Sequence, residues 1–140
     1  MNFLLDTNGV SEWMKPRPNA GLIRWLEQVD EDRVYLSVVT LAEIRYGVDR
    51  LAEGAKRRGI EQWLQRDLQL RFEGRIVAID SAIADACGAI VARRETLGHP
   101  IGVMDAFIAA TAETHELTLV TRNTKDFMHV AGSIENPWSS

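Results

Sequence analysis

The chain has 140 residues, of which 46% are hydrophobic and 26% charged, so it can bury a core of ordinary size and is not a disordered chain. Its net charge of −4 argues against tight nonspecific binding to nucleic acid, which requires many phosphate contacts, but does not exclude a nuclease. No apolar run can cross a membrane and no signal peptide is recognisable, so we expect a cytoplasmic protein without membrane association. The single cysteine, Cys87, is expected in the core, and the three scattered histidines do not have zinc-ligand spacing.

Short apolar strands alternate with longer helical segments along the chain. We expect strands at about 2–6, 33–37, 75–79 and 117–121, with a weaker one near 133–136. We expect helices after Pro18-Asn19, around 41–51, over 55–72, after the N-cap pair Asp80-Ser81 and over 105–115, with a short helical turn at 124–128. This alternation is typical of βαβ units. The sequence therefore predicts an α/β fold with a short, mostly parallel central sheet flanked by helices, in a single domain spanning residues 1–140.

Three acidic residues stand where a strand gives way to a helix. Asp6 follows the apolar run 3–5, Glu43 lies beyond the strand-like 34–36, and Asp105 opens an alanine-rich helix. Ligands bind at the carboxyl ends of the strands in open α/β sheets, so we expect these side chains to meet there. Clustered carboxylates repel one another unless a cation joins them. We therefore predict a Mg²⁺ or Mn²⁺ site in which Asp6, Asp105 and Glu43 are the ligands.

Each acid also has a purely structural alternative. Asp6 is suited to an Asx-turn that closes a strand. Thr40-x-x-Glu43 fits a capping box at a helix start, and Asp105 in a first helical turn is favoured by the helix dipole. The combination favours a site, because a charge directly after a buried strand is costly without a partner. We expect both Glu43 and Asp105 in first helical turns that face the same sheet edge.

A fourth group of polar residues follows the strand at 117–121. Asn123 offers a neutral oxygen ligand or a partner for metal-bound water, Asp126 offers an anionic one, and Thr121 is placed to hydrogen-bond a carboxylate. The alternative for Asn123 is an N-cap paired with Thr124. Arg122 and Lys125 are candidates for contact with a nucleic-acid backbone, whereas basic pairs such as Arg93-Arg94 are interpreted as solvated helix faces.

These motifs together resemble the PIN-domain family, and more closely the VapC-type toxins of its FitB-like branch. The resemblance covers essentially the whole chain, and four motifs in this order and spacing are far more specific than any one of them. The motifs are Leu4-Leu5-Asp6-Thr7-Asn8, Thr40-x-x-Glu43-x-x-x-Gly47, the segment Gly102–Ala112 around Asp105, and Thr121-Arg122-Asn123-x-x-Asp126-Phe127. The ending Ile134-Glu135-Asn136-Pro137-Trp138 is also similar to that of the family.

The resemblance implies a PIN-like three-layer fold and a Mg²⁺/Mn²⁺-dependent endoribonuclease toxin that acts on tRNA or another structured RNA. It also implies a homodimer and neutralisation by a VapB-type antitoxin. Carried over by position, Asp6, Glu43 and Asp105 form the acidic core, supported by Thr7 and Thr121. Asn123 stands where many members have a fourth acid, and Asp126 is the possible substitute. Gly9 stands where we expect an apolar residue in relatives, and a glycine there loosens the first turn of the helix after Asp6.

In the mechanism we expect, Mg²⁺ bound by Asp6 and Asp105 activates a water for attack on a phosphodiester, and Glu43 holds that water or a second metal. Three other functions stay open. A receiver-like phosphate-handling domain would need adjacent acids after its first strand, and here a single Asp6 ends that strand. A non-catalytic interaction module with this fold would bind metal without cleaving. A DNA nuclease would use the same residues.

Overall fold

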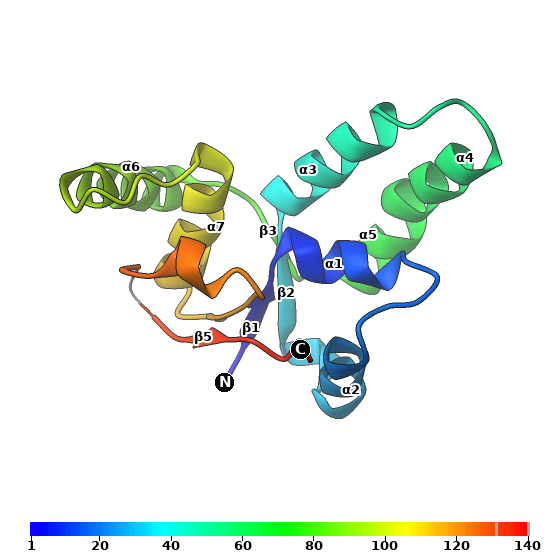
Figure 1. The fold of residues 1–140 in the computed structure, drawn as a ribbon, viewed down its shortest axis with the longest axis horizontal. Helices are drawn as coiled ribbons and strands as arrows, with labels where there is room; N and C mark the ends of the chain where they lie inside the picture. The colour runs from blue at the N-terminus through cyan, green and yellow to red at the C-terminus, as the bar shows by residue number, and fades with distance from the viewer. Residues whose placement is uncertain (131, 140) are drawn as a thin grey trace.

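The computed structural model describes residues 1–130 and 132–139 and is built around a five-stranded sheet in the order β3-β2-β1-β4-β5 (Figure 1). The strands are β1 (Phe3–Leu5), β2 (Val34–Ser37), β3 (Ile76–Val77), β4 (Thr118–Val120) and β5 (Ile134–Glu135). All four neighbouring pairs are parallel. The α/β class and the parallel sheet are therefore confirmed, with each strand shorter than the range predicted for it.

Helices connect the strands and cover both faces of the sheet. They are α1 (Thr7–Trp13), α2 (Ala20–Gln28), α3 (Val38–Asp49), α4 (Ala55–Gln62), α5 (Leu68–Arg71), α6 (Ser81–Thr96) and α7 (Val103–Thr114). The π-helical turn η2 (Trp63–Asp67) joins α4 to α5, so the helix expected over 55–72 is a single segment with a wider central turn. Two 3₁₀ turns, η1 (Glu31–Arg33) and η3 (Thr124–Phe127), complete the set. None of the helices in the described ranges is long and apolar enough to span a bilayer.

Side chains at the helix starts account for most of the boundaries. Asn19 caps α2 by accepting hydrogen bonds from the amides of Gly21 and Leu22, and Asp80 caps α6 by accepting one from Ile83. The cap at Asp80 and the helix after Pro18-Asn19 are confirmed as predicted. The start of α3 is different, because Ser37 is its cap and accepts from the amide of Val39 at 3.0 Å.

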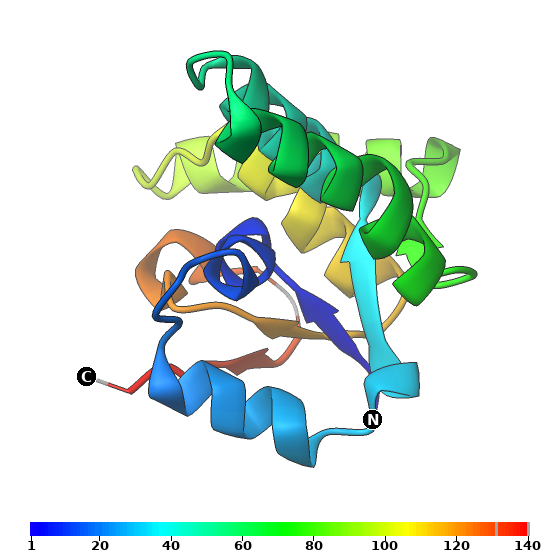
Figure 2. The ribbon, with the colours of Figure 1, turned by 90° about the vertical axis from the view of Figure 1, so that its right-hand side faces the viewer.

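The sheet separates two apolar cores, and strand β1 shows how one sequence supplies both. Leu4 faces the core formed with α6 and α7, whereas the next residue, Leu5, faces the core shared with α1, α2 and α5. This alternation follows from the two-residue period of a strand. Figures 1 and 2 show the two helical layers on opposite sides of the sheet, which confirms the three-layer arrangement. Cys87 is buried in the first core, as expected.

Candidate functional site

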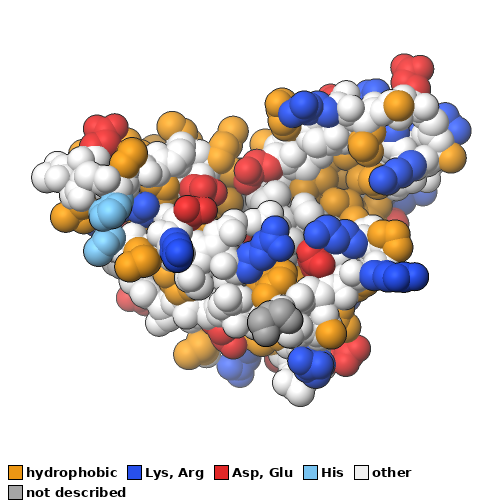
Figure 3. All heavy atoms as spheres, in the orientation of Figure 1, with side chains coloured by type: hydrophobic (Ala, Val, Ile, Leu, Met, Phe, Trp, Pro, Cys, Tyr) orange, Lys and Arg blue, Asp and Glu red, His pale blue; other side chains and the backbone are white. Residues whose placement is uncertain are grey.

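The three predicted acids line one small pocket at the carboxyl ends of the strands. The pocket holds about 80 Å³. Its lining consists of Asp6, Thr7, Asn8, Glu43, Asp105, Ile108 and Asn123. In Figure 3, acidic side chains gather in the hollow between the α6–α7 side and the α3–α4 arm, and basic side chains lie along its lower rim. Residues from distant parts of the sequence therefore meet where the parallel sheet predicted them.

Asp6 is the most buried of the three acids, with 3% of its surface exposed. It leaves β1 and is the N-cap of α1, where its carboxylate accepts a hydrogen bond from the Gly9 amide at 2.8 Å. The pKa of Asp6 is raised to about 6, mainly by burial and also by the charges of Asp105 and Glu43, although the hydrogen bonds from Thr121 and Gly9 lower it. The structural role and a place in the site thus coexist in one side chain.

Glu43 is held by a hydroxyl from another helix. The Thr7 hydroxyl donates to Glu43 Oε1 at 2.6 Å and lies 3.1 Å from the Thr40 hydroxyl. The predicted capping box and the placement of Glu43 in a first helical turn are wrong, because α3 already begins at Val38. Glu43 instead lies in the second turn, where its side chain faces α1.

Asp105 lies in the first turn of α7, as predicted, and is half-buried. Burial is the main cause that raises its pKa. The charges of Glu43 and Asp126 raise the pKa further, and the guanidinium of Arg94 lowers it. Asp105 therefore lies in the field of two further carboxylates and one buried cation.

The residues after β4 divide into those inside the pocket and those around it. Asn123 lines the pocket, and its backbone N–H donates to the Thr121 hydroxyl at 3.0 Å. Asn123 is the N-cap residue of η3 by position, as the alternative had it, but among the described residues its side chain makes no capping hydrogen bond. Asp126 is exposed and lies outside the lining, although its charge acts on Asp105. Arg122 and Lys125 are exposed beside it.

The pocket has the donor chemistry of a site for a hard divalent cation, since three carboxylates and an amide oxygen share it. The side chains are not already arranged around one point. Among residues 1–130 and 132–139, no three His, Cys, Asp or Glu side chains are close enough to bind one metal ion together. The Glu43 carboxylate is turned to Thr7 and that of Asp6 to the Gly9 amide. The residue types fit a metal, and the side chains would have to turn to bind it.

Gly9 matters for its lack of a side chain. A Cβ built at Gly9 would lie 2.3 Å from Leu5 Cδ1 and 2.7 Å from Leu5 Cγ. The fully buried Leu5 side chain thus occupies the space that another residue would need. The Gly9 amide still bonds Asp6, so this glycine does not displace the carboxylate.

Arg94 is a neighbour of the site that sequence reasoning missed. The expectation of a solvated Arg93-Arg94 pair is wrong for Arg94, which is only 4% exposed. Its guanidinium contacts the chain near Asp126 and acts on the pKa of Asp105. The sequence held a signal, because Arg94 continues the buried helical stripe of Ile83, Cys87 and Ile90.

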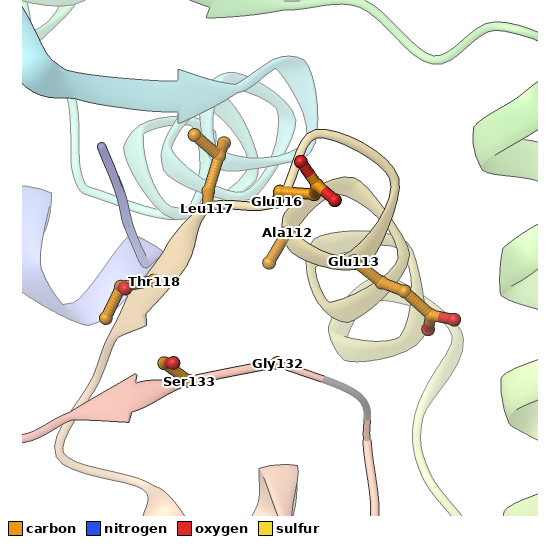
Figure 4. Close-up of a pocket in the computed structure, with 7 residues that line it drawn as sticks. All are labelled: Ala112, Glu113, Glu116, Leu117, Thr118, Gly132 and Ser133. Atoms are coloured by element: carbon orange, nitrogen blue, oxygen red, sulfur yellow. The ribbon is translucent and has the colours of Figure 1, made fainter. Parts of the chain in front are cut away.

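A larger hollow lies at the opposite, amino end of the sheet. It measures about 300 Å³ and is lined by Ala112, Glu113, Glu116, Leu117, Thr118, Gly132 and Ser133. Figure 4 shows that the carboxylates of Glu113 and Glu116 point in different directions and that Glu113 points away from Thr118 and Ser133. Polar groups do not converge in this hollow, in spite of its size.

Comparison with known proteins gives the same relationship over nearly the whole chain. The PIN domain family model matches residues 3–133. The chain is 38% identical to "Toxin FitB" of Neisseria gonorrhoeae, covering 96% of this chain and 97% of that protein. It is 32% identical to "VapC ribonuclease Y4jK" of Sinorhizobium fredii, covering 96% of each chain. It is 31% identical to "tRNA(fMet)-specific endonuclease VapC" of Shigella flexneri, covering 99% of each.

Solved structures agree with the sequence matches. The crystal structure of FitAcB from Neisseria gonorrhoeae superposes with a TM-score of 0.91 at 38% identity, covering 99% of each chain. A toxin–antitoxin complex from Klebsiella pneumoniae superposes with a TM-score of 0.75 at 29% identity, covering 99% of this chain and 100% of that one.

Proposed function

The chain belongs to the PIN domain family, and from this membership we propose that it is an endoribonuclease toxin neutralised by a cognate VapB-type antitoxin. Relatives named as a VapC ribonuclease and as a tRNA(fMet)-specific endonuclease support RNA cleavage, with tRNA or another structured RNA as the substrate class. The observation that carries the proposal is the pocket itself. Asp6, Glu43 and Asp105 come from three separate elements and line the same 80 Å³.

A divalent cation, Mg²⁺ or Mn²⁺, is the cofactor of the proposed reaction. Asp6 and Asp105 would hold it and Asn123 would add a neutral oxygen, whereas Glu43 would hold the attacking water or a second ion. When bound, such an ion lowers the pKa of water and neutralises charge on a phosphodiester. The raised pKa of Asp6 fits this assignment, because a buried carboxylate among other carboxylates is stabilised in its ionised form by a cation.

The protein's own residues supply orientation and proton transfer. The Thr7 hydroxyl donates a hydrogen bond to Glu43 Oε1, whereas no described residue donates one to Glu43 Oε2. Glu43 Oε2 is therefore our candidate to accept the proton of the attacking water. The Thr121 hydroxyl accepts a hydrogen bond from the backbone N–H of Asn123. Its hydrogen bond to the Asp6 carboxylate lowers the pKa of Asp6 and so favours the ionised form. Thr7 and Thr121 thus hold Glu43 and Asn123 beside the pocket before substrate arrives, and the carboxylates would turn to bind a metal.

RNA binding is assigned to exposed basic residues beside the pocket. Arg122 precedes Asn123 on the β4–η3 connection and Lys125 lies in η3, where a phosphate next to the cleaved bond would lie. They would bind the backbone without reading sequence. Asp126, which lies outside the pocket lining, is a candidate for tuning Asp105 through its charge.

Cleavage of purified total tRNA by the isolated protein tests the enzyme proposal. Reactions contain Mg²⁺ or Mn²⁺, with EDTA as one control and Asp6→Asn as another. Asp32→Asn is the matched variant, because Asp32 is an exposed acid in η1, outside the residues that line the pocket. Discrete fragments that disappear with EDTA and Asp6→Asn, but persist with Asp32→Asn, support the proposal. Fragments that survive both controls contradict it, and cutting of DNA alone would select a DNA nuclease.

The antitoxin proposal is supported by the related toxin–antitoxin complex and by the surface of this chain. Trp13 and Trp63 are only partly buried against the second core, and Tyr46 is 65% exposed on α3. Aromatic residues of this kind are enriched at interfaces. Purification from the native host should recover a small bound protein that suppresses cleavage. Recovery of fully active toxin without any partner would contradict this part.

A homodimer is also proposed. Light scattering of the purified protein should give twice the chain mass of 15.7 kDa. A monomer at micromolar concentration would contradict it.

A further inference from the structure

Arg94 joins two segments that lead into the acidic pocket from different sides. It lies in the last turn of α6, where its Nε donates to the carbonyl of His99 at 2.7 Å. Its Nη1 donates to the carbonyl of Asp126 at 2.8 Å. The first carbonyl belongs to the loop that leads into α7 and Asp105. The second lies in η3, which directly follows Asn123.

The contacts around Arg94 make this connection tight. The His99 amide donates back to the Arg94 carbonyl at 2.9 Å, so side chain and backbone of Arg94 hold the same residue. The rings of His99 and His129 stack with their centroids 5.6 Å apart, which adds a second link between the two segments. The planar guanidinium suits this task because its donors point in fixed directions.

The charge of Arg94 is a further observation. The side chain is only 4% exposed, yet within residues 1–130 and 132–139 no carboxylate lies within ion-pair distance of it. A buried cation without an adjacent anion is costly unless other groups compensate it. The two backbone carbonyls that Arg94 binds, at His99 and Asp126, are the compensating groups that the structure shows.

We propose that Arg94 is a positioning residue of the acidic site, which fixes the α7 side of the pocket relative to the Asn123 side through the carbonyls of His99 and Asp126. This inference rests on the proposed nuclease function. Arg94 does not line the pocket and touches no reacting group. Its effect on the reaction passes through the two segments that it joins.

A matched variant exists at the other end of the sheet. Arg75 is also a part-buried arginine that holds backbone carbonyls, with Nη1 donating to Val34 at 2.6 Å and Nη2 donating to Arg71 at 2.7 Å. It lies directly before β3, at the amino end of the strands. Arg75→Met removes a comparable clamp without touching the pocket, so it reports what loss of stability alone does.

The test compares Arg94→Met, Arg94→Lys and Arg75→Met at a temperature where circular dichroism shows all three folded. Steady-state cleavage gives kcat and KM for RNA, and calorimetry gives Mn²⁺ affinity without RNA. We expect Arg94→Met to lower kcat by about 10- to 100-fold, the usual cost of losing a partner that orients a ligand, with a smaller change in KM. Mn²⁺ binding should weaken as well. Arg94→Lys should recover part of both, whereas Arg75→Met should leave both unchanged.

Equal kcat and Mn²⁺ affinity in Arg94→Met and Arg75→Met would overturn the proposal. If the wild-type chain cuts no RNA, the nuclease function fails and amide spectra of the metal-free proteins decide the positioning role separately. The amides of Asp105 and Asn123 should then shift in Arg94→Met and not in Arg75→Met. Unshifted amides would overturn the role of Arg94 whatever the function of the chain.

Discussion

The two ends of the parallel sheet differ in what they bury. At the amino end, a hollow of about 300 Å³ is lined by acids that point apart. At the carboxyl end, the pocket is only about 80 Å³, yet Asp6, Glu43 and Asp105 share it. Asp6, Ser37, Thr40 and Thr121 are each at most 3% exposed there. Buried polar groups that converge, and not volume, distinguish the functional end of this sheet.

Both ends are built from the same kinds of side chain, which makes the contrast informative. Each has acids, and each has an arginine that holds backbone carbonyls, Arg94 at one end and Arg75 at the other. Within the described residues, three acids from separate elements line one small pocket at the carboxyl end, because parallel strands all finish on that edge. Variants at the two ends should therefore separate activity from stability.

The largest expected effect is on activity. Asp105→Asn should lower RNA cleavage by more than about 100-fold, since even outer partners of a metal site are worth about 10- to 100-fold. The metal-free variant should be at least as stable as the wild type, because one of the clustered negative charges is gone. Urea unfolding in EDTA measures this. A clearly lower free energy of unfolding would favour a helix-dipole role for Asp105 instead.

The next effect is on the pH dependence of stability. The pKa of Asp6 rises from 3.8 to about 6 on folding, so its ionisation costs stability as pH rises through that range. Between pH 3 and pH 7 the metal-free wild type should lose about 3 kcal/mol relative to Asp6→Asn, at about 1.4 kcal/mol per pKa unit. Urea titrations of both proteins at four pH values test this. Parallel pH profiles would rule out a perturbed Asp6.

A smaller effect is expected at Thr7. Thr7→Val removes the donor to Glu43 Oε1 while keeping the shape of the side chain. We expect kcat to fall about 10-fold, as for other residues that orient a ligand. Thr7→Ser keeps the hydroxyl and should retain most of the activity. If valine and serine behave alike, orientation of Glu43 by Thr7 is unimportant.

Gly9 tests packing beneath the pocket. Gly9→Ala should lower the free energy of unfolding by about 1 kcal/mol, because crowding of Leu5 outweighs the gain in helix propensity. Gly59→Ala is the matched variant, since a Cβ at Gly59 in α4 meets nothing within 4 Å. That variant should gain up to about 1 kcal/mol. Denaturant unfolding of Gly9→Ala and Gly59→Ala compares their free energies of unfolding. If both variants are more stable than the wild type, the Leu5 side chain moves aside at little cost.

The smallest effect is expected at the amino end. Glu116→Gln changes the charge of the larger hollow and should leave kcat unchanged, because Glu116 follows the C-terminal end of α7 whereas Asp105 lies in its first turn. A loss comparable to that of Thr7→Val would erase the contrast between the two ends.

The sequence predicted the sheet and the pocket because their signals are local. Apolar runs mark the strands, stripes mark the helix faces, and the parallel order brings Asp6, Glu43 and Asp105 to one edge. The start of α3 was not predictable in the same way. Ser37 and Thr40 are both good caps by composition, and the choice is visible only from the bond between Thr40 and Thr7.

Arg94 was missed for a related reason. Arg93 and Arg94 together look like a charged pair on the surface of a helix. Composition does not reveal which of two adjacent arginines is buried. Its carbonyl partners, at His99 and Asp126, are set by tertiary structure and leave no side-chain pattern. The buried stripe through Ile90 was the one local indication.

The strands at the two edges of the sheet, β3 and β5, are only two residues long. Such short edges offer almost no free backbone for another chain to extend the sheet, which protects against edge-to-edge aggregation. They also leave little room for a partner that binds by adding a strand. Recognition of this molecule by a protein partner must then depend on its helices and their side chains, and specificity between related pairs can change through surface substitutions that leave the sheet untouched.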